Sequence, residues 1–493
     1  MRILADQAFS RAAGALLVGG NSVRLLRDAA ENFPAWREAL QSATRSIFFE
    51  SYILDDDGVG TAFRDLLVEK ARAGVRVRVV RDWLGSPGRL FSRFWRPLIA
   101  AGGELRTFNP PRLDSPLGWL SRDHRKSIVV DGRIGFVTGL CVSGKWLGDP
   151  RRKREPWRDT GVEILGPAVA DLERAFAQVW AATGPPIPDS DLTDPAAIAR
   201  AGDVALRVVA SAPATAGLFR LDQMIAALAR ERLWLTDAYF VPVTPYVEAL
   251  RAAARDGVDV RILVPGASDL VLVAALSRSG YRPLLEAGIR IFEWNGTMLH
   301  AKTAVADSRW ARVGSTNLNL ASFIGNYELD VAIDDPRVAG EMEAMYVQDL
   351  GRSTEVVLAR RRRRIRPTLA RAVEVEDETQ IRRARSGSAG RAAAGALRIG
   401  SAVGRAITRP RELGYAEGRV TTASGLLLIG LAAIAFHSPR VLAWPVSAVA
   451  AWFGVAVLLR GWRGYRASRT GSPRDAPTPS PSERSPPGGR TAG

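Results

Sequence analysis

Apolar and polar residues follow one pattern twice along residues 22–350. Each copy starts with an apolar strand, passes through an amphipathic helical stretch, and returns to a β-branched strand after a glycine turn. These strands read SIFFESYI and ARAGVRVRVVRD in the first copy, and RLWLTDAYF and ARDGVDVRILVP in the second. AGGELRTFNP and AGIRIFEWNG then precede a further strand pair in each copy. Strands that alternate with helices predict an α/β fold, with helices packed over a mixed sheet.

The last strand pair of each copy is predicted to form a hairpin. The sequences are SIVVDGRIGFVTG and TAVADSRWARVGS, and each has a turn-forming dipeptide at its centre, Asp-Gly at 131–132 and Asp-Ser at 307–308. Short polar turns of this kind join antiparallel strands. The residues just before each hairpin therefore lie at the start of equivalent strands in the two copies.

Changes in composition divide the chain into further segments. Residues 183–203 are rich in proline and aspartate, which predicts a linker between a first half at 1–182 and a second half at 204–350. Residues 351–419 contain many arginines and small residues, and we interpret them as a basic juxtamembrane linker. Residues 460–493 are rich in proline, serine and glycine, and are predicted to be disordered.

Two apolar runs make residues 420–459 a candidate transmembrane hairpin. The second run, 441–459, holds 19 residues without a charge, close to the ~20 that cross a bilayer. Arginines precede and follow the pair, so the positive-inside rule predicts that both ends are cytoplasmic. The alternative is a buried helical hairpin of a soluble domain, but the runs are apolar on all faces rather than along one stripe.

Charge is distributed unevenly between the two ends of the chain. The net charge is +17, yet residues 1–350 contain 43 basic and 42 acidic residues, against 25 and 9 in residues 351–493. A nuclease is expected to concentrate positive charge around its active site, so the near-neutral part argues against a nucleic-acid partner. One cysteine and three scattered histidines provide no metal-ligand cluster, and we predict neither a metal nor a cofactor.

A repeated His-x-Lys segment carries the candidate chemistry. DHRKSIVVD contains His124 and Lys126, and LHAKTAVAD contains His300 and Lys302. Alternate residues of a strand share a face, so each histidine points with its lysine. If the halves pack about a pseudo-twofold axis, both pairs meet in one cleft. This set suits a phosphate diester, because lysines stabilise oxygen charge while one histidine attacks phosphorus and the other transfers protons.

A histidine in such a role needs a partner that fixes its tautomer. Asp159 in WRDTGVEI follows the first motif by 35 residues, and Glu328 in NYELDVAI follows the second by 28, so we take them as the orienting carboxylates. Asp131 and Asp307 complete the candidate catalytic set as part of the repeated motif, but they fall in the turns and are assigned a structural role. Three residues of VGSTN, namely Gly314, Ser315 and Asn317, are predicted to line the cleft and bind phosphate.

HRKSIVVD, HAKTAVAD, the stretch GSTNLNLASFIGNYELDVAI and the duplication resemble the phospholipase D superfamily with its paired HKD motifs. LLRDAAENFPAWREALQSATRSIFFESYILDDDGVGTAF and WRDTGVEILGPAV are more narrowly similar to bacterial cardiolipin synthases. The resemblance covers residues 22–350 and implies two phospholipase D-like halves packed as a pseudo-dimer. It also implies a metal-free transfer from one phosphatidylglycerol to another, with release of glycerol and a phosphatidyl-histidine intermediate.

What the resemblance implies for single residues is more specific. His124 corresponds to the nucleophile and His300 to the general acid and base, and the family's downstream carboxylates support Asp159 and Glu328. One residue departs from the pattern: the family commonly has Gly-Gly-x-Asn where this chain has Thr-Gly-Leu-Cys at 138–141, so Cys141 replaces the first-half counterpart of Asn317. Phosphate contacts in the first half are therefore expected to be weaker or rearranged.

Other functions are compatible with the same residues. With water as acceptor the protein would be a phospholipase D that releases phosphatidic acid; a nuclease of the superfamily and a non-catalytic membrane scaffold are further alternatives. For the leading hypothesis we expect phosphatidylglycerol as the substrate, the membrane as a partner, and a place in the bacterial inner membrane with the catalytic domain on the cytoplasmic side. The basic sequence RRKRE at 151–155 either contacts lipid headgroups near the cleft or forms a solvated loop.

Overall fold

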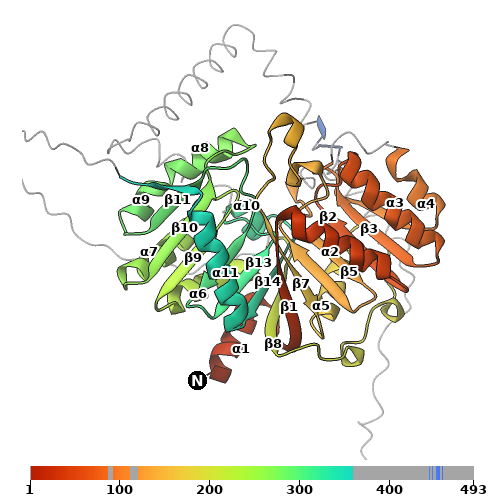
Figure 1. Ribbon diagram of the computed structural model, residues 1–493, viewed down its shortest axis with the longest axis horizontal. Helices are drawn as coiled ribbons and strands as arrows, with labels where there is room; N and C mark the ends of the chain where they lie inside the picture. Colours follow the sequence, from red (N-terminus) through yellow and green to blue (C-terminus); the bar gives the residue numbers. More distant parts are fainter. Residues whose placement is uncertain are drawn as a thin grey trace, which may run out of the picture. The chain divides into compact units, whose positions relative to one another are not determined.

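The computed structural model describes residues 2–86, 93–110 and 120–358, together with seven positions between 444 and 458 (Figure 1). Apart from those seven positions, the predicted basic linker from residue 359 on, the candidate hairpin at 420–459 and the predicted disordered tail lie outside the described residues. Within the described part of the chain, no helix combines the length and apolar character needed to span a bilayer.

One mixed sheet of 15 strands runs through both halves. The first half contributes β1 (Val18–Arg27), β2 (Ser46–Ser51), β3 (Arg76–Asp82), β4 (Glu104–Phe108), β5 (Lys126–Val130), β6 (Ile134–Thr138) and β7 (Thr160–Leu165). The second contributes β8 (Val204–Ser211), β9 (Arg232–Thr236), β10 (Asp259–Pro265), β11 (Arg290–Trp294), β12 (Thr303–Ala306), β13 (Trp310–Gly314), β14 (Glu328–Asp334) and β15 (Ser353–Val356).

The order of the strands repeats on the two sides of the sheet. From the central antiparallel β8–β1 pair, β14, β13, β12, β9, β10 and β11 follow on one side, and β7, β6, β5, β2, β3 and β4 on the other. The outer three strands of each series are parallel, whereas the others are antiparallel. The predicted α/β fold with a mixed sheet is confirmed, and the sequence duplication reappears as this duplicated strand order.

Helices cover both faces of the sheet (Figure 1). They are α1 (Arg2–Ala13), α2 (Asp28–Ser42), α3 (Gly58–Arg72), α4 (Arg96–Ala100), α5 (Val169–Ala182), α6 (Gly217–Leu228), α7 (Thr244–Arg255), α8 (Val271–Ser279), α9 (Tyr281–Leu285), α10 (Leu320–Ile324) and α11 (Pro336–Leu350). In β2, Phe48 packs in the core shared with α5 and α11, while Ile47 and Phe49 pack in the core under α2 and α3. Burial on both faces explains the unbroken apolar run in this strand.

Both predicted hairpins form, and an aspartate fixes each turn. Asp131 and Asp307 adopt left-handed backbone conformations, with φ of 54° and 50°. The Asp131 carboxylate accepts hydrogen bonds from the backbone N–H groups of residues 44–46, and the Asp307 carboxylate accepts them from residues 230–232. Each aspartate therefore ties its hairpin to the start of the neighbouring strand, β2 or β9, which is a structural contact.

Residues 183–203, predicted as a linker, lie along the first half. They contain two short 3-10 turns, Asp189–Asp191 and Pro195–Ala197. Asp191 forms ion pairs with Arg76 and Arg78 of β3, and Ile187 is buried against the core. The segment thus connects β7–α5 to β8 by a path that packs on the domain.

Candidate active site

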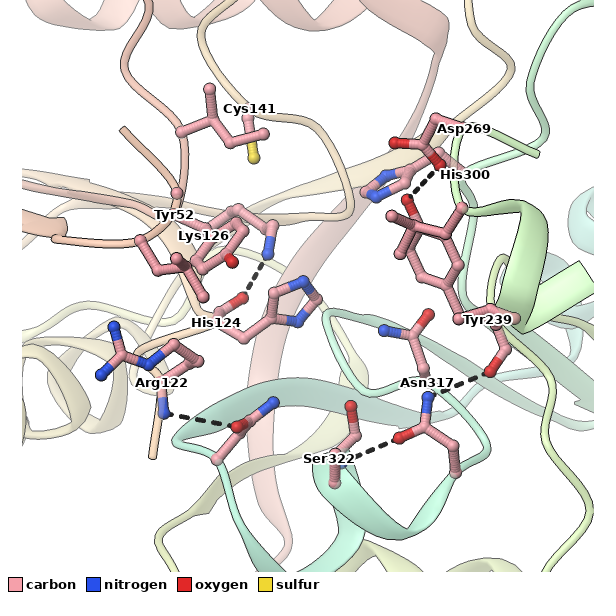
Figure 2. A pocket seen from close by; sticks show the side chains of 18 of the residues that line it. Tyr52, Arg122, His124, Lys126, Cys141, Tyr239, Asp269, His300, Asn317 and Ser322 are labelled. Carbon is pink, nitrogen blue, oxygen red and sulfur yellow. Dashed lines mark hydrogen bonds between the residues drawn. The ribbon is translucent and has the colours of Figure 1, made fainter. Parts of the chain in front are cut away.

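A cavity of about 680 Å³ lies where the two copies of the motif meet (Figure 2). His124 and Lys126 of the first half line it together with His300 and Asn317 of the second. The loops that follow the parallel strands β2, β3, β9 and β10 form other parts of its wall. The cavity therefore lies beyond the carboxyl ends of the parallel strands, where open α/β sheets usually bind ligands.

The backbone of each histidine is bound to the opposite half. His124 N–H donates to the carbonyl of Tyr327 at 2.9 Å, and His300 N–H donates to the carbonyl of Arg158 at 2.7 Å. Tyr327 immediately precedes Glu328 in the sequence, as Arg158 precedes Asp159. These two equivalent bridges bring each candidate carboxylate beside the histidine of the other half.

The side chains are paired across the halves in the same way. His124 Nδ1 lies 3.0 Å from Glu328 Oε2, and His300 Nδ1 lies 2.8 Å from Asp159 Oδ2. The sequence order had associated each carboxylate with the upstream histidine of its own half, and that association is wrong. Strand order explains the error, because β7 and β14 flank the central β8–β1 pair and each begins with its carboxylate, or directly after it, at the boundary between the halves.

These contacts define the tautomer of each imidazole. An ionised carboxylate can only accept, so Nδ1 of each histidine carries the proton and Nε2 keeps a free lone pair. His124 Nδ1 is also 3.1 Å from the backbone oxygen of Ser315, a second acceptor on the same side. Both histidines line the cavity with Nδ1 engaged, which leaves Nε2 as the nitrogen available to a ligand.

Different neighbours support the two carboxylates. Ser315 donates its hydroxyl to Glu328 Oε2 at 2.6 Å. The indole N–H of Trp146 donates to Asp159 Oδ2 at 2.9 Å. Burial raises the pKa of Asp159 and of Glu328, but the partner histidine, a nearby lysine and these hydrogen bonds outweigh it, so that both pKa values lie below the ordinary range. Both carboxylates are therefore ionised near neutral pH.

Burial also lowers the pKa of each histidine. For His124 the opposing effect of Glu328 is smaller, and Lys126 lowers the pKa further. For His300, burial and then Lys302 lower the pKa to about 3, against the effect of Asp159. The empty site therefore holds two neutral imidazoles beside two ionised carboxylates.

The two signature lysines are buried, each against its own histidine and a tyrosine. Lys126 Nζ donates to the carbonyl of His124 and lies 5.1 Å from the ring centroid of Tyr52. Lys302 Nζ donates to the carbonyl of His300, and lies 5.7 Å from the Tyr239 ring. Lys126 lines the cavity, whereas Lys302 lies behind the lining. Burial lowers the pKa of Lys302 to about 8.

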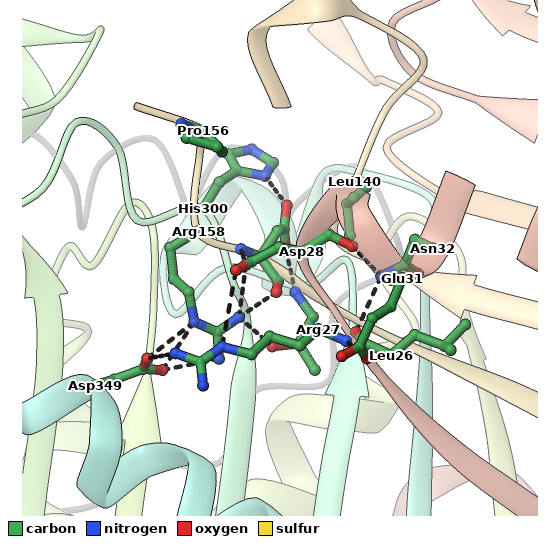
Figure 3. A network of polar contacts seen from close by, with 12 residues as sticks. Leu26, Arg27, Asp28, Glu31, Asn32, Leu140, Pro156, Arg158, His300 and Asp349 are labelled. Carbon is green, nitrogen blue, oxygen red and sulfur yellow. Dashed lines mark hydrogen bonds and ion pairs between the residues drawn. The ribbon is translucent and has the colours of Figure 1, made fainter. Parts of the chain in front are cut away.

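An ion-pair network behind Asp159 links the site to the last helix of the second half (Figure 3). Arg158, with a side chain 4% exposed, pairs with Asp349 of α11 at 2.8 Å and with Asp28 at 3.1 Å. Asp28 also accepts a hydrogen bond from the backbone N–H of Asp159 at 2.8 Å. The network fixes the backbone of the carboxylate that orients His300, and the sequence analysis did not anticipate it.

The other predicted site residues divide into two groups. Asn317 and Cys141 line the cavity, as expected for equivalent positions, and Figure 2 shows both near the two histidines. Ser315 instead supports Glu328, and Gly314 lies against Asp330, so neither lines the cavity as predicted. Gly314 is the last residue of β13, and Ser315 follows it directly with its N–H bonded to the carbonyl of Leu329 in β14, whereas Asn317 lies in the loop beyond.

Aromatic residues of the cavity were missed by the sequence analysis. Tyr52 and Tyr239 lie beside His124 and His300, with ring centroids 5.0 and 5.8 Å away. Trp146 and Trp157 also pack against His300. The two tyrosines do carry a signal, since ESYI and TDAYF occupy matching places after the first strand of each copy.

Comparisons with known proteins agree with this architecture. Residues 222–350 match a family model described as cardiolipin synthase, PLD-like domain. The chain is 32% identical to a cardiolipin synthase of Halalkalibacterium halodurans over 345 residues, which covers 68% of this chain and 67% of the relative. It is 35% identical to cardiolipin synthase A of Pseudomonas fluorescens over 349 residues, or 69% of this chain and 70% of the relative.

A solved structure supports the fold alone. The crystal structure of phosphatidylserine synthase from Haemophilus influenzae superposes with a TM-score of 0.56 and 14% sequence identity, covering 71% of this chain and 92% of that one. With relatives at 32–35% identity over two thirds of their length, the chain belongs to the cardiolipin synthase family of phospholipase D-like proteins, and it is a phosphatidyltransferase of the phospholipase D type.

Proposed function

We propose that the protein transfers a phosphatidyl group from one phosphatidylglycerol to a second, through a phosphohistidine on His124, to form cardiolipin and glycerol. The cardiolipin synthases to which the chain is similar support this reaction. The observation that carries the mechanism is the crossed pairing, in which each histidine faces one cavity with Nδ1 held by a carboxylate of the other half.

In the first step, the lone pair on His124 Nε2 attacks phosphorus of the donor lipid. The phosphorus–oxygen bond to the headgroup glycerol breaks, and its electron pair stays on that oxygen. A proton from His300 Nε2 completes the leaving hydroxyl, so free glycerol departs and His300 becomes neutral. Glu328 stabilises the positive charge that develops on the His124 ring, as a buried carboxylate does beside a catalytic imidazole.

In the second step, His300 takes the proton of the acceptor hydroxyl. The resulting oxygen nucleophile attacks phosphorus, the phosphorus–nitrogen bond breaks, and its electrons return to His124 Nε2. Burial and Lys302 lower the pKa of His300 in the empty site, so His300 takes up the proton needed for the first step from solvent when the anionic substrate binds. A bound phosphate anion offsets the lysine charge and raises the histidine pKa toward the working range.

Lys126 and Lys302 supply positive charge at the reaction centre, and Asn317 supplies a neutral donor. The amide of Asn317 lies in the cavity wall, and no described residue accepts a hydrogen bond from its NH₂ group, which can therefore donate to a phosphate oxygen. Fixed charges and dipoles of this kind stabilise the charge that builds up on the non-bridging oxygens.

The reaction is tested with the detergent-solubilised full chain and phosphatidylglycerol. We expect cardiolipin and glycerol in equal amounts, measured by lipid mass spectrometry and an enzymatic glycerol assay. Phosphatidic acid as the sole lipid product would instead identify water as the acceptor. Absence of both products across pH and donor lipids would reject the transferase mechanism.

We further propose that the chain acts at the bacterial inner membrane, with its catalytic domain and both termini on the cytoplasmic side. A water-insoluble substrate and the apolar runs of sequence within 420–459 support this. Reporter enzymes fused to the C-terminus provide the test: a reporter active only in the cytoplasm should be active, and one active only outside should not.

A further inference from the structure

We propose that the His300 side of the cavity is the acceptor subsite, in which Lys145 binds the phosphate of the incoming lipid and Asp269 accepts a hydrogen bond from its glycerol. This inference rests on the proposed function and deepens it. The two lipids of the reaction differ at this point, because the acceptor keeps a phosphate of its own while its hydroxyl approaches the phosphohistidine.

The first observation is a cation over Trp157, an aromatic neighbour of His300, that forms no ion pair with a described carboxylate. Lys145, in the short 3-10 turn Gly144–Trp146, lines the cavity and is solvent-exposed. It makes no ion pair with any residue that the structure describes. Its Nζ lies 5.7 Å from the centroid of the Trp157 ring, which lies 5.8 Å from the centroid of His300.

The second observation is a carboxylate on another aromatic neighbour of His300. Asp269, in the loop between β10 and α8, lines the cavity and accepts a hydrogen bond from the Tyr239 hydroxyl at 2.8 Å. The Tyr239 ring lies 5.8 Å from His300, and Figure 2 shows Asp269 and Tyr239 beside that histidine. Asp269 forms no ion pair within the described residues and uses only Oδ1 for the Tyr239 hydroxyl, so its second oxygen can accept a hydrogen bond from a ligand in the cavity.

The His124 side offers no such pair of groups. Its ring contacts Tyr52, and two cations line the cavity nearby. Lys126 is buried and donates to the His124 carbonyl, and Arg122 is paired with Asp82 at 3.0 Å. Arg122 also donates to the carbonyl of Asn109, so its charge is committed to the protein wall. Among the described residues that line this cavity, a solvent-exposed cation outside any ion pair and a carboxylate therefore occur together only on the His300 side.

The chemistry of the acceptor matches these two groups. The attacking hydroxyl must reach His300, which removes its proton, and the adjacent hydroxyl of the glycerol can then donate to Asp269. The phosphate of the acceptor carries one negative charge, which Lys145 can bind as a compact cation. Leaving glycerol uses the Asp269 contact in the first step but has no phosphate for Lys145, so Lys145 distinguishes a lipid acceptor from a free alcohol.

The experiment is a competition between acceptors. Full-length protein receives phosphatidylglycerol in detergent micelles with deuterated glycerol, and mass spectrometry measures the ratio of cardiolipin to deuterated phosphatidylglycerol. Lys145→Met should lower this ratio about tenfold, because a hydrogen bond to a charged group is lost for one acceptor only. Lys145→Glu should lower it further through repulsion, and Lys145→Arg should restore it to within about twofold of the original value.

Arg133→Met is the control. Arg133 is an exposed cation in the β5–β6 hairpin turn of the same half and does not line the cavity, so its loss should leave the ratio and both rates unchanged. Equal ratios for Lys145→Met and the unaltered protein would overturn the subsite while cardiolipin synthesis stands. Deuterated phosphatidylglycerol without cardiolipin from the unaltered protein would reject the proposed function itself, and the subsite with it.

Asp269 has a separate readout, the preference for glycerol over 1-propanol as acceptor. Asp269→Ala should reduce this preference about fivefold or more, because propanol has no second hydroxyl to lose a partner. Asp269→Asn retains an oxygen for the Tyr239 hydroxyl and should show a smaller loss. An unchanged preference in Asp269→Ala would remove Asp269 from the acceptor subsite.

Discussion

The two sides of the cavity are built from equivalent strands, yet they surround their histidines differently. Among the described residues, His124 has one aromatic ring beside it, and a serine hydroxyl holds its carboxylate. His300 lies among three aromatic rings, and an indole N–H holds its carboxylate. Burial and lysine lower the pKa of both histidines, for His300 to about 3. Duplication thus provided two imidazoles, and divergence around them provided the different environments that a nucleophile and an acid–base group require.

The comparison also shows that neither half forms a complete site. Each histidine receives a backbone acceptor and a carboxylate from the opposite half. Replacing a carboxylate in one half is therefore expected to impair the histidine of the other half. Four predictions test this account, beginning with the largest effect.

The greatest loss is expected from removing either histidine. His124→Ala and His300→Ala should each lower kcat by about 10⁴-fold or more, because the first removes the proposed nucleophile and the second the proposed proton-transfer group. With a donor whose leaving group is an activated phenol, which needs no proton, only His300→Ala should accumulate a phosphatidyl adduct. Intact-protein mass spectrometry detects the adduct, and peptide mapping should locate it at His124.

His437→Ala is the control, since that histidine stands in the sequence between the two apolar runs, more than 100 residues from either His-x-Lys segment, and its loss should leave turnover unchanged. An adduct on His300 in the His124→Ala variant would reverse the assignment of the two roles. Near-normal turnover in either motif variant would contradict the two-histidine mechanism.

The next largest effect concerns the crossed carboxylates. Glu328→Gln and Asp159→Asn should each reduce kcat by about 10²–10⁴-fold, because the amide no longer fixes the Nδ1–H tautomer. Double-mutant cycles then read the connectivity: His124 should couple to Glu328 and His300 to Asp159, with losses that are far from additive. Strong coupling within a half, between His124 and Asp159, would contradict the crossed geometry.

The crossed pairing of histidines and carboxylates could not be predicted from the sequence, although much of the fold could. Periodicity identified the strands, the turns at Asp131 and Asp307, and the duplication, because these depend on local patterns of burial. The repeated His-x-Lys segment identified the shared cavity in the same way. Which carboxylate meets which histidine depends on strand order across the whole sheet, and no local pattern in WRDTGVEI or NYELDVAI encodes it.

The supporting residues show the same limit. Arg158 precedes a predicted site residue, but its partner Asp349 is 191 positions away at the end of a helix. Lys145 and Asp269 come from different halves and reach His300 through different aromatic rings. Such contacts form only when loops from distant segments converge, so they become visible in the folded protein and not in its sequence.

A smaller effect is expected from pH. Burial lowers the pKa of Lys302 to about 8, so the free enzyme loses this cation as the pH rises through that value. Because the protonated form offsets phosphate charge, kcat/KM should fall by about tenfold per pH unit above pH 8. A bound anion favours the protonated form, so the corresponding decline in kcat should begin at higher pH.

Lys302→Arg separates this group from others that titrate. An arginine stays protonated throughout the range, so the alkaline decline in kcat/KM should disappear even if the maximum rate is reduced. Lys126→Arg changes the equivalent position of the first half and should leave the decline in place. A decline that persists unchanged in Lys302→Arg would assign it to another group.

The smallest effect is expected at the equivalent positions Cys141 and Asn317, where one half has a thiol and the other an amide. Both line the cavity, but burial raises the pKa of the Cys141 thiol, which leaves a neutral and weak donor where Asn317 offers an amide. Cys141→Asn should therefore raise kcat/KM by about threefold, since a new hydrogen bond to phosphate is partly offset by the cost of burying the amide. Asn317→Cys is the reciprocal change and should lower kcat/KM by about tenfold, because both sides would then present thiols. If Cys141→Asn slows the reaction while Asn317→Cys does not, phosphate is bound mainly by the first half. Cys141 would then contribute more to phosphate binding than Asn317, the opposite of what their side chains predict.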